Sequence, residues 1–397
     1  MNALRLEWRT AAGAFACIIL LTLPFAHSVA VRNVSLGIAW IATLSAWRSL
    51  AVPRVPLLWL FAAWAALGLL SLIWAVDLQY SASELKTEVV YPVLVFALFF
   101  ALSDVLWLER FRRTLLVATI LSFASALYWR VFLAPEPTGA LFNGPGMYST
   151  YLVGVYPFVL VWLLKPNAPG NERIVHAVVI VAILCGGAIT LNRMLWIVLA
   201  LQTVLALALQ WRGASATVFH RRLILFSAGA AIVFGGALYA ISSKRFAVDP
   251  ALPEAVGETM AGDVRLQMWK RAADRIAAHP FSGTGFGRGS LRQDFRTEFG
   301  DGLFWHAHNV VLNYGLSMGI SGVAMILLLF GVVLWRFWQI WRSGDPALAP
   351  YALAGTVMVA GMFAKNMTDD LFIRQSALLY WSFAGMILGA HAKRRDA

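Results

Sequence analysis

The sequence predicts an all-α membrane protein that crosses the bilayer about twelve times and carries a partly helical cap outside it. The composition is the first reason: the 397 residues are 60% hydrophobic and only 13% charged, whereas soluble domains are about half apolar and a quarter charged. The second is the length of apolar runs such as 57–74 and 223–241, since about 20 helical residues span a bilayer. The third is a single long polar interruption, residues 243–307.

Twelve apolar segments are candidate spans. In chain order they are residues 11–30, 33–50, 56–75, 88–103, 112–132, 146–164, 174–190, 194–211, 222–242, 308–335, 348–365 and 371–391. Arg5 and Arg9 precede the first one, whose apolar run is longer than that of a signal peptide, so we interpret it as an uncleaved span. Residues 1–242 are therefore assigned to a membrane domain with spans 1–9, 243–307 to the cap, and 308–397 to spans 10–12.

The basic residues predict the orientation. With the N-terminus inside, seventeen of the 32 Lys and Arg residues fall in cytoplasmic segments and six in short outer loops; the rest lie in the long segment, which does not determine orientation. Both termini are expected in the cytoplasm and residues 243–307 outside. The net charge of +12 is scattered between spans, which indicates contact with anionic lipid rather than nucleic acid.

Within the cap, Asp263 can cap an amphipathic helix of about 263–278, which His279-Pro280 would stop. The glycine-rich stretch GTGFGRG, residues 283–289, follows. A dinucleotide-binding fingerprint would need glycine where Arg288 stands, and a strand before it. We therefore expect a tight backbone bend and no nucleotide.

The stretch WHAHNVVLNYGLSMGISG places two histidines before the tenth span. If the helix includes His308, then Gly315, Gly319 and Gly322 lie within about 40° of its direction. Glycines on one face admit a close neighbour, so His308 should point toward packed protein and is the candidate general base. His306 lies off that face and is expected to be structural or interfacial. A histidine that only caps the span is the alternative for His308.

No metal or other cofactor is expected, because the remaining histidines are scattered and the two cysteines lie inside separate apolar runs.

Two arginines are candidate anion-binding residues. Arg193 begins a span whose N-terminus faces outside, and a guanidinium at a helix N-terminus favours an anion; the alternative is that it extends to the lipid headgroups. Arg265 continues an apolar stripe of the cap helix formed by Trp269, Ala272 and Ile276, so it is directed where that helix packs. The alternative for Arg265 is a structural ion pair with an acid of the last outer loop, Asp369 or Asp370. Further candidate substrate-binding residues are Lys86, Arg130, Arg288 and Asn309.

These motifs resemble those of a known family. His308-Asn309, nine residues, Gly319, two residues and Gly322 resemble the signature of O-antigen ligases and their polymerase relatives. The segment from Arg265 through Trp269 to the His-Pro and glycine turn is similar to the family's cap helix, and IWAVDLQYSASELK (73–86) to its early outer loop. TLNRM at 190–194 departs from the family's Ser-Arg-Gly type of turn.

The resemblance implies a GT-C-like, inverting, metal-independent glycosyltransferase of the bacterial inner membrane with a periplasmic site. It would move O-antigen polysaccharide from undecaprenyl diphosphate to a sugar hydroxyl of lipid A–core oligosaccharide. His308 would be the base, and Arg193 and Arg265 would stabilise the donor diphosphate.

Three alternatives stay open. An O-antigen polymerase would use the same donor with a lipid-linked acceptor, and a protein O-oligosaccharyltransferase would glycosylate protein hydroxyls. A transporter or flippase of lipid-linked sugars should show repeated halves and ionisable residues near the midplane. Here the unusual charges cluster at the outer ends of the spans, which favours an enzyme.

Overall fold

A computed structural model of the chain describes residues 2–50, 52–133, 137–165, 169–211, 229, 236, 264–299 and 305–396. All regular secondary structure in these ranges is helical. The predicted ninth span (222–242), apart from residues 229 and 236, and the expected cap residue Asp263 lie outside the described residues.

The first half of the chain contains both short and long helices. They are α1 (Asn2–Thr22), α2 (Val29–Ser45), α3 (Trp47–Leu50), α4 (Leu58–Ser71), α5 (Leu78–Leu85), the π-helical turn η3 (Lys86–Val90), α6 (Tyr91–Leu102), α7 (Val105–Phe132), α8 (Pro137–Phe142), α9 (Pro145–Leu163), α10 (Gly170–Thr190) and α11 (Arg193–Trp211). The second half contains α14 (Val264–Ala278), α15 (Arg292–Phe299), α16 (Val310–Arg342), α17 (Ala349–Asn366) and α18 (Arg374–Asp396).

Among the described residues, seven helical stretches are long and apolar enough to cross a membrane. They are Ala26–Ser45, Leu78–Leu102, Val105–Phe132, Pro145–Leu163, Gly170–Thr190, Arg193–Gln210 and Val310–Arg342. The apolar side chains of Ile41, Leu58 and Val204 are 62%, 66% and 62% exposed. Outward apolar side chains of this kind are stable where lipid covers them. The described part of the chain is thus all-helical, and several of its helices are long and apolar enough to span a membrane.

Two sequence expectations need correction. The first predicted span, 11–30, contains a turn, because α1 ends at Thr22 and α2 begins only at Val29. The predicted outer loop 73–86 is largely the helix α5, whose first turn is capped by Asp77: its carboxylate accepts the Tyr80 N–H at 3.0 Å. Aspartate is a favourable N-cap, so the polar residues of this segment begin a helix.

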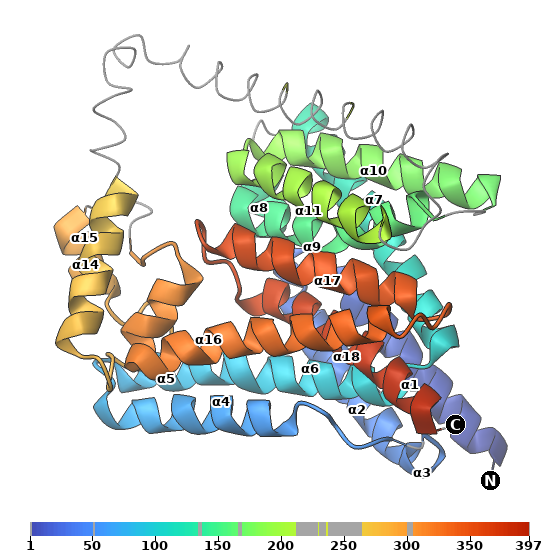
Figure 1. The fold of residues 1–397 in the computed structure, drawn as a ribbon, viewed down its shortest axis with the longest axis horizontal. Helices are drawn as coiled ribbons and strands as arrows, with labels where there is room; N and C mark the ends of the chain where they lie inside the picture. Colours follow the sequence, from blue (N-terminus) through green and yellow to red (C-terminus); the bar gives the residue numbers. More distant parts are fainter. Residues whose placement is uncertain are drawn as a thin grey trace.

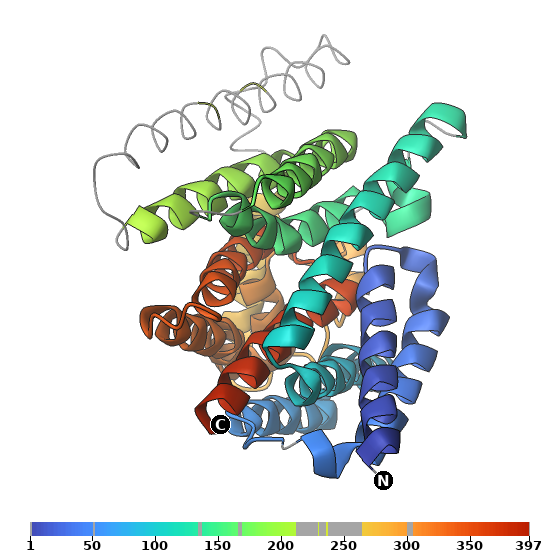
Figure 2. The same ribbon diagram turned by 90° about the vertical axis from the view of Figure 1, so that its right-hand side faces the viewer.

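The helices run side by side in one bundle (Figure 1). α14 and α15 lie at one end, beyond the start of α16, and the N- and C-termini lie together at the other end. Seen from that other end, the pair α1 and α2 and the pair α10 and α11 occupy different flanks (Figure 2). α9 is buried along almost its whole length.

Close backbone contact holds the centre of the bundle together. α18 packs along α6, where a Cβ atom at Gly385 would lie 2.4 Å from the Phe96 carbonyl oxygen and one at Gly389 would lie 2.3 Å from that of Phe100. Small residues four apart allow this approach, which is a common way to pack helices in membranes. The aromatic rings of Phe96 and Trp381 fill the space beside the contact, 6.0 Å apart.

The end of the bundle that carries α14 is where the polar residues meet. α11 and α16 begin there and α17 ends there, as the hydrogen bonds described below show. α9 begins there too, because its Gly146 lies against Asp369, and α18 follows α17 after a short loop. Helices that alternate in direction in this way bring loops far apart in sequence to one face of the bundle.

Candidate functional site

The two histidines lie in a turn, residues 305–309, that precedes α16. Asn309 caps the helix, since its side-chain oxygen accepts the N–H groups of Val311 and Leu312 at 2.9 and 3.1 Å. His308 has a φ of +48°, so it is outside the helix. The expectation that His308 shares a helical face with Gly315, Gly319 and Gly322 is therefore wrong. An N-cap residue must have non-helical backbone angles, and the cap at Asn309 starts the helix after the histidine.

His306 and His308 have different surroundings. His306 is buried, and its Nδ1 accepts the backbone N–H of His308 at 3.0 Å. Burial, and then the positive charges of Arg288, His308 and Arg265, hold the pKa of His306 well below its usual value. A neutral ring with Nδ1 as acceptor fixes the turn. The His308 ring is half-buried and lies beside it, with 4.0 Å between ring centroids.

The cap helix α14 packs directly on this turn. Met268 and Ala272 are fully buried, and the Trp269 indole N–H donates to the Ala307 carbonyl at 2.8 Å. Arg265, in the first turn of α14, is exposed. Its charge nevertheless contributes to the lowered pKa values of both His306 and Asp369.

The glycine-rich turn completes a break in α16. Met318 and Gly319 have non-helical angles, so carbonyl groups before the break lose their helical partners. The amides of Thr284 and Gly285 donate to the Leu316 and Ser317 carbonyl oxygens at 2.8 and 3.1 Å. Residues 283–289 therefore form a tight bend whose backbone pairs with α16.

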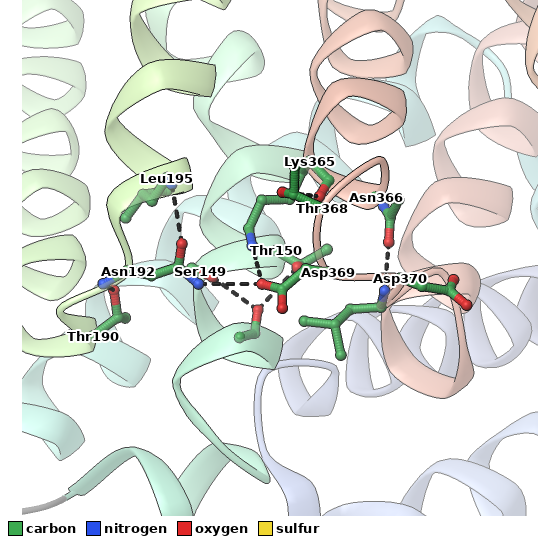
Figure 3. Close-up of polar contacts among 12 residues, drawn as sticks. Ser149, Thr150, Thr190, Asn192, Leu195, Lys365, Asn366, Thr368, Asp369 and Asp370 are labelled. Atoms are coloured by element: carbon green, nitrogen blue, oxygen red, sulfur yellow. Dashed lines mark hydrogen bonds and ion pairs between the residues drawn. The ribbon is translucent and has the colours of Figure 1, made fainter. Parts of the chain in front are cut away.

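The loop between α17 and α18 is the centre of the site; we call residues 367–370 the Asp369 loop. The Asp369 carboxylate pairs with the Lys365 ammonium and accepts the Asn192 side-chain N–H at 3.2 Å (Figure 3). Asn192 immediately precedes Arg193, and its oxygen accepts the Leu195 N–H at 3.2 Å, which caps α11. Asn309 binds the same loop, because its N–H donates to the Met367 carbonyl at 3.0 Å.

The electrostatics of this loop favour negative charge at Asp369. Burial raises the pKa of its carboxyl, but the Lys365 ammonium, the Asn192 hydrogen bond and the Arg265 charge together lower it below its usual value. The neighbouring Asp370 differs: burial outweighs the nearby Arg288 charge and the Asn313 hydrogen bond, so its pKa is raised. Only one of the two adjacent acids is therefore strongly held as an anion.

Arg288 faces inward, toward a narrow cavity behind the histidines. Its guanidinium lies 4.7 Å from the Trp305 ring centroid and donates to the Asp370 carbonyl. Glu88, Asn313 and Asp370 line the cavity together with Arg288. Asn313 links the cavity to the turn, because its N–H donates to the Asp370 carboxylate and its oxygen accepts the Ala307 N–H at 3.0 Å.

Five of the seven candidate residues lie in the turns and helix ends around the Asp369 loop: His308, Arg265, Arg193, Arg288 and Asn309. Asn309 and Arg288 have positioning contacts within the protein. Lys86 and Arg130 are exposed, on η3 and in the last turn of α7, and do not take part in the contacts described around the Asp369 loop. Within the described part of the chain, no three His, Cys, Asp or Glu side chains form a group that could hold a metal ion.

Lys365, Asn192 and Glu88 are polar residues of this region that sequence reasoning missed. Lys365 is the last residue of the predicted span 348–365, and it lies fully buried in the last turn of α17. The spacing of Lys365 and Asp369, four residues apart between two apolar runs, is a signal that the sequence does contain.

The sequence was also compared with known protein families. Residues 176–327 match the family model described as O-antigen ligase. The matched segment contains Arg193, Arg265, Arg288 and His308, and it confirms the resemblance to the O-antigen ligase and polymerase family. A search of curated proteins gave no match.

Proposed function

We propose that this chain, whose residues 176–327 match the O-antigen ligase family model, transfers O-antigen polysaccharide from undecaprenyl diphosphate to a sugar hydroxyl of lipid A–core oligosaccharide. The observation that carries the proposal is the convergence of His308, Arg265 and the Arg193 end of α11 on the Asp369 loop. The proposed setting is the bacterial inner membrane, with the site in the periplasm and both termini in the cytoplasm. The position of the termini at the end opposite α14 supports this orientation.

In the proposed reaction, the acceptor hydroxyl oxygen attacks the anomeric carbon of the donor sugar. The bond from that carbon to the diphosphate oxygen breaks, and the His308 imidazole takes the hydroxyl proton. Imidazole is the side chain that most often serves as a general base near neutral pH. A single displacement of this kind inverts the anomeric centre, and the diphosphate leaves with the bonding electron pair.

The negative charge on the diphosphate grows as that bond breaks. Arg265 reaches the site from the cap, and Arg193 stands at the N-terminus of α11, where the helix dipole favours an anion. Guanidinium groups bind phosphate oxygens with paired hydrogen bonds. Fixed donors directed at developing charge are each worth about 10²–10³ in rate.

An O-antigen polymerase or a protein O-oligosaccharyltransferase would use the same donor and the same residues. The matched family contains both ligases and polymerases, so the acceptor separates these functions. Transport of a lipid-linked sugar is the more distant alternative. In the described residues, the polar cluster lies at the helix ends around the Asp369 loop, which supports an enzyme.

Reconstitution tests the proposal. Purified full-length protein in detergent is given undecaprenyl diphosphate-linked O-antigen and lipid A–core acceptor, without added metal. We expect a glycosylated core lipid from the wild type, and a rate lower by about 10²–10⁴ from His308→Ala, the usual contribution of a general base. Wild-type rates from His308→Ala contradict the base assignment, and a requirement for divalent metal contradicts the arginine account. Elongated donor chains in place of core product assign the polymerase function.

A further inference from the structure

Lys365 is a charged residue at a position where burial of a charge costs desolvation free energy. Its side chain is fully buried in the last turn of α17, and the Asp369 carboxylate four residues later is its ion-pair partner. Buried ion pairs add little net stability, because desolvation offsets the attraction between the charges. An ion pair of this kind, with a fully buried cation, is therefore a candidate for a functional role.

The Asp369 carboxylate occupies a position built for an oxyanion. Lys365 approaches from α17 and the Asn192 N–H from the start of α11. The first turn of α9 borders the third side, since a Cβ atom on Gly146 would lie 3.5 Å from the carboxylate oxygen. Figure 3 shows the carboxylate among these three helix ends.

Positive charge surrounds this position beyond its direct contacts. Arg265 lowers the pKa of Asp369, and Arg193 adjoins Asn192 at the start of α11. The Asp369 side chain is 20% exposed whereas Lys365 is 0% exposed. A rotation of Asp369 toward its exposed side would therefore leave a buried ammonium without its anion.

We propose that this position is a phosphate seat: one phosphate of a diphosphate ligand displaces the Asp369 carboxylate and takes Lys365 and Asn192 as its partners. The inference rests on the proposed function, which supplies the diphosphate. Carboxylate and phosphate accept the same N–H donors, and phosphate carries more charge and more acceptor oxygens. Without a bound ligand, the Asp369 carboxylate thus neutralises the Lys365 ammonium, and it competes with an incoming phosphate for the same donors.

Binding of inorganic diphosphate tests the seat. Titration calorimetry on the full chain in detergent compares the wild type with Asp369→Asn, which keeps the shape and removes the competing anion. We expect at least about tenfold tighter binding by Asp369→Asn, which corresponds to about 1.4 kcal/mol, and at least about tenfold weaker binding by Lys365→Met. Glu298→Gln, which removes an exposed acid of α15, is the matched control and should stay within about twofold of the wild type.

Folding of the variants is checked by thermal melting. Lys365→Arg keeps the positive charge and should retain binding if Lys365→Met proves unstable. Diphosphate should also raise the melting temperature of Asp369→Asn more than that of the wild type, because at one concentration a ligand that binds more tightly stabilises the folded protein more. Equal or weaker binding by Asp369→Asn overturns the seat, and so does the absence of binding by every variant.

Two further measurements identify the cause of a failure. Phosphatidylglycerol added to the micelles should not displace diphosphate from Asp369→Asn; displacement would assign the seat to a lipid headgroup and overturn the proposal. The transfer assay is scored separately. If Asp369→Asn binds diphosphate more tightly but the wild type shows no transfer activity, the phosphate seat stands and the ligase assignment is rejected. If the wild type shows transfer but Asp369→Asn does not bind more tightly, only the phosphate seat is rejected.

Discussion

At the scale of single residues, the two histidines of the turn 305–309 divide into a support and a candidate base. The sequence singles out His308, but the geometric reason it offers, a helical face shared with glycines, does not hold. The structural distinction is that the His306 Nδ1 accepts the His308 N–H. A side-chain to backbone hydrogen bond in a loop depends on backbone angles that a residue pattern does not specify, so the sequence could not predict it.

The buried neutral state of His306 predicts a dependence of stability on pH. The ordinary histidine pKa is 6.5, and burial and nearby positive charges lower that of His306 in the folded protein. As the pH falls below 6.5, the unfolded chain binds a proton that the folded chain does not, so acid favours unfolding until the lower folded pKa is reached. His306→Asn keeps an acceptor and does not titrate. It should lose less melting temperature than the wild type between about pH 7.5 and about pH 5.5.

His279 supplies the control for this experiment, because it is exposed at the end of α14. His279→Asn should leave the slope of melting temperature against pH as it is in the wild type. An identical slope in His306→Asn and the wild type would show that His306 is not a neutral buried group.

Arg265 offers a second prediction at this scale. Arg265→Met should lower the transfer rate by about 10²–10³, because a fixed charge directed at the leaving diphosphate is lost. Arg275→Met on the same helix removes a guanidinium that pairs only at the surface, with Asp294 at 3.2 Å, and should keep most of the activity. Equal losses in the two variants would mean that only the net charge of the cap matters.

At the scale of elements, the glycines of α16 have a structural role that the sequence predicts only in part. For Gly315 and Gly319 the expected close neighbour is present, and it is the cap helix and the turn after it; Gly322 instead lies against the Tyr314 carbonyl of α16 itself. A Cβ atom at Gly315 would lie 2.6 Å from Ile276 of α14. Gly319 breaks the helix with a φ of +66°. The pattern of glycines indicates close approach, and it does not reveal which segment approaches.

Gly319→Ala should destabilise the protein strongly. Its Cβ atom would lie 2.2 Å from the Pro280 carbonyl oxygen, and its φ is positive. A non-glycine residue in such a conformation costs about 1–3 kcal/mol before any clash is counted. Gly331→Ala, in the same helix with open space around it, should be neutral or slightly stabilising. Melting temperatures in detergent measure both, and equal values would mean that the break is not required.

At the scale of the whole molecule, hydropathy predicts the helices well and their ends less well. A helix lies at each predicted span within the described residues, because long apolar runs leave few alternatives in a membrane. For the Asp369 loop, the sequence predicts only that Asp369 or Asp370 could form an ion pair with Arg265. The contacts of this loop join residues about 60 to 180 positions apart, such as Asn309 with Met367 and Asn192 with Asp369. Such long-range pairs depend on how the helices pack, which the pattern of a single sequence does not specify.

The opposite end of the bundle has a buried charge network that joins three helices. Arg112 of α7 binds Glu109 through two hydrogen bonds, at 2.7 and 2.6 Å, and contacts the His176 ring of α10 at 2.6 Å. The Tyr351 hydroxyl of α17 donates to Glu109 at 2.8 Å. α10 and α17 run from this network to the candidate site, where each of them ends. Their packing at the network therefore also helps to position their ends at the site.

Glu109→Gln should therefore lower the melting temperature of the whole protein. The change leaves the buried Arg112 charge without its anion, and breaking one side of a buried pair costs about 3–5 kcal/mol. The double variant Glu109→Gln with Arg112→Met removes both charges and should recover much of the loss, since an apolar replacement of a buried pair is often neutral. Both folded variants should still bind inorganic diphosphate at low temperature, because the network lies far from the Asp369 loop. A loss of binding by the double variant at a temperature where it is folded would show instead that the network controls the site through α10 and α17.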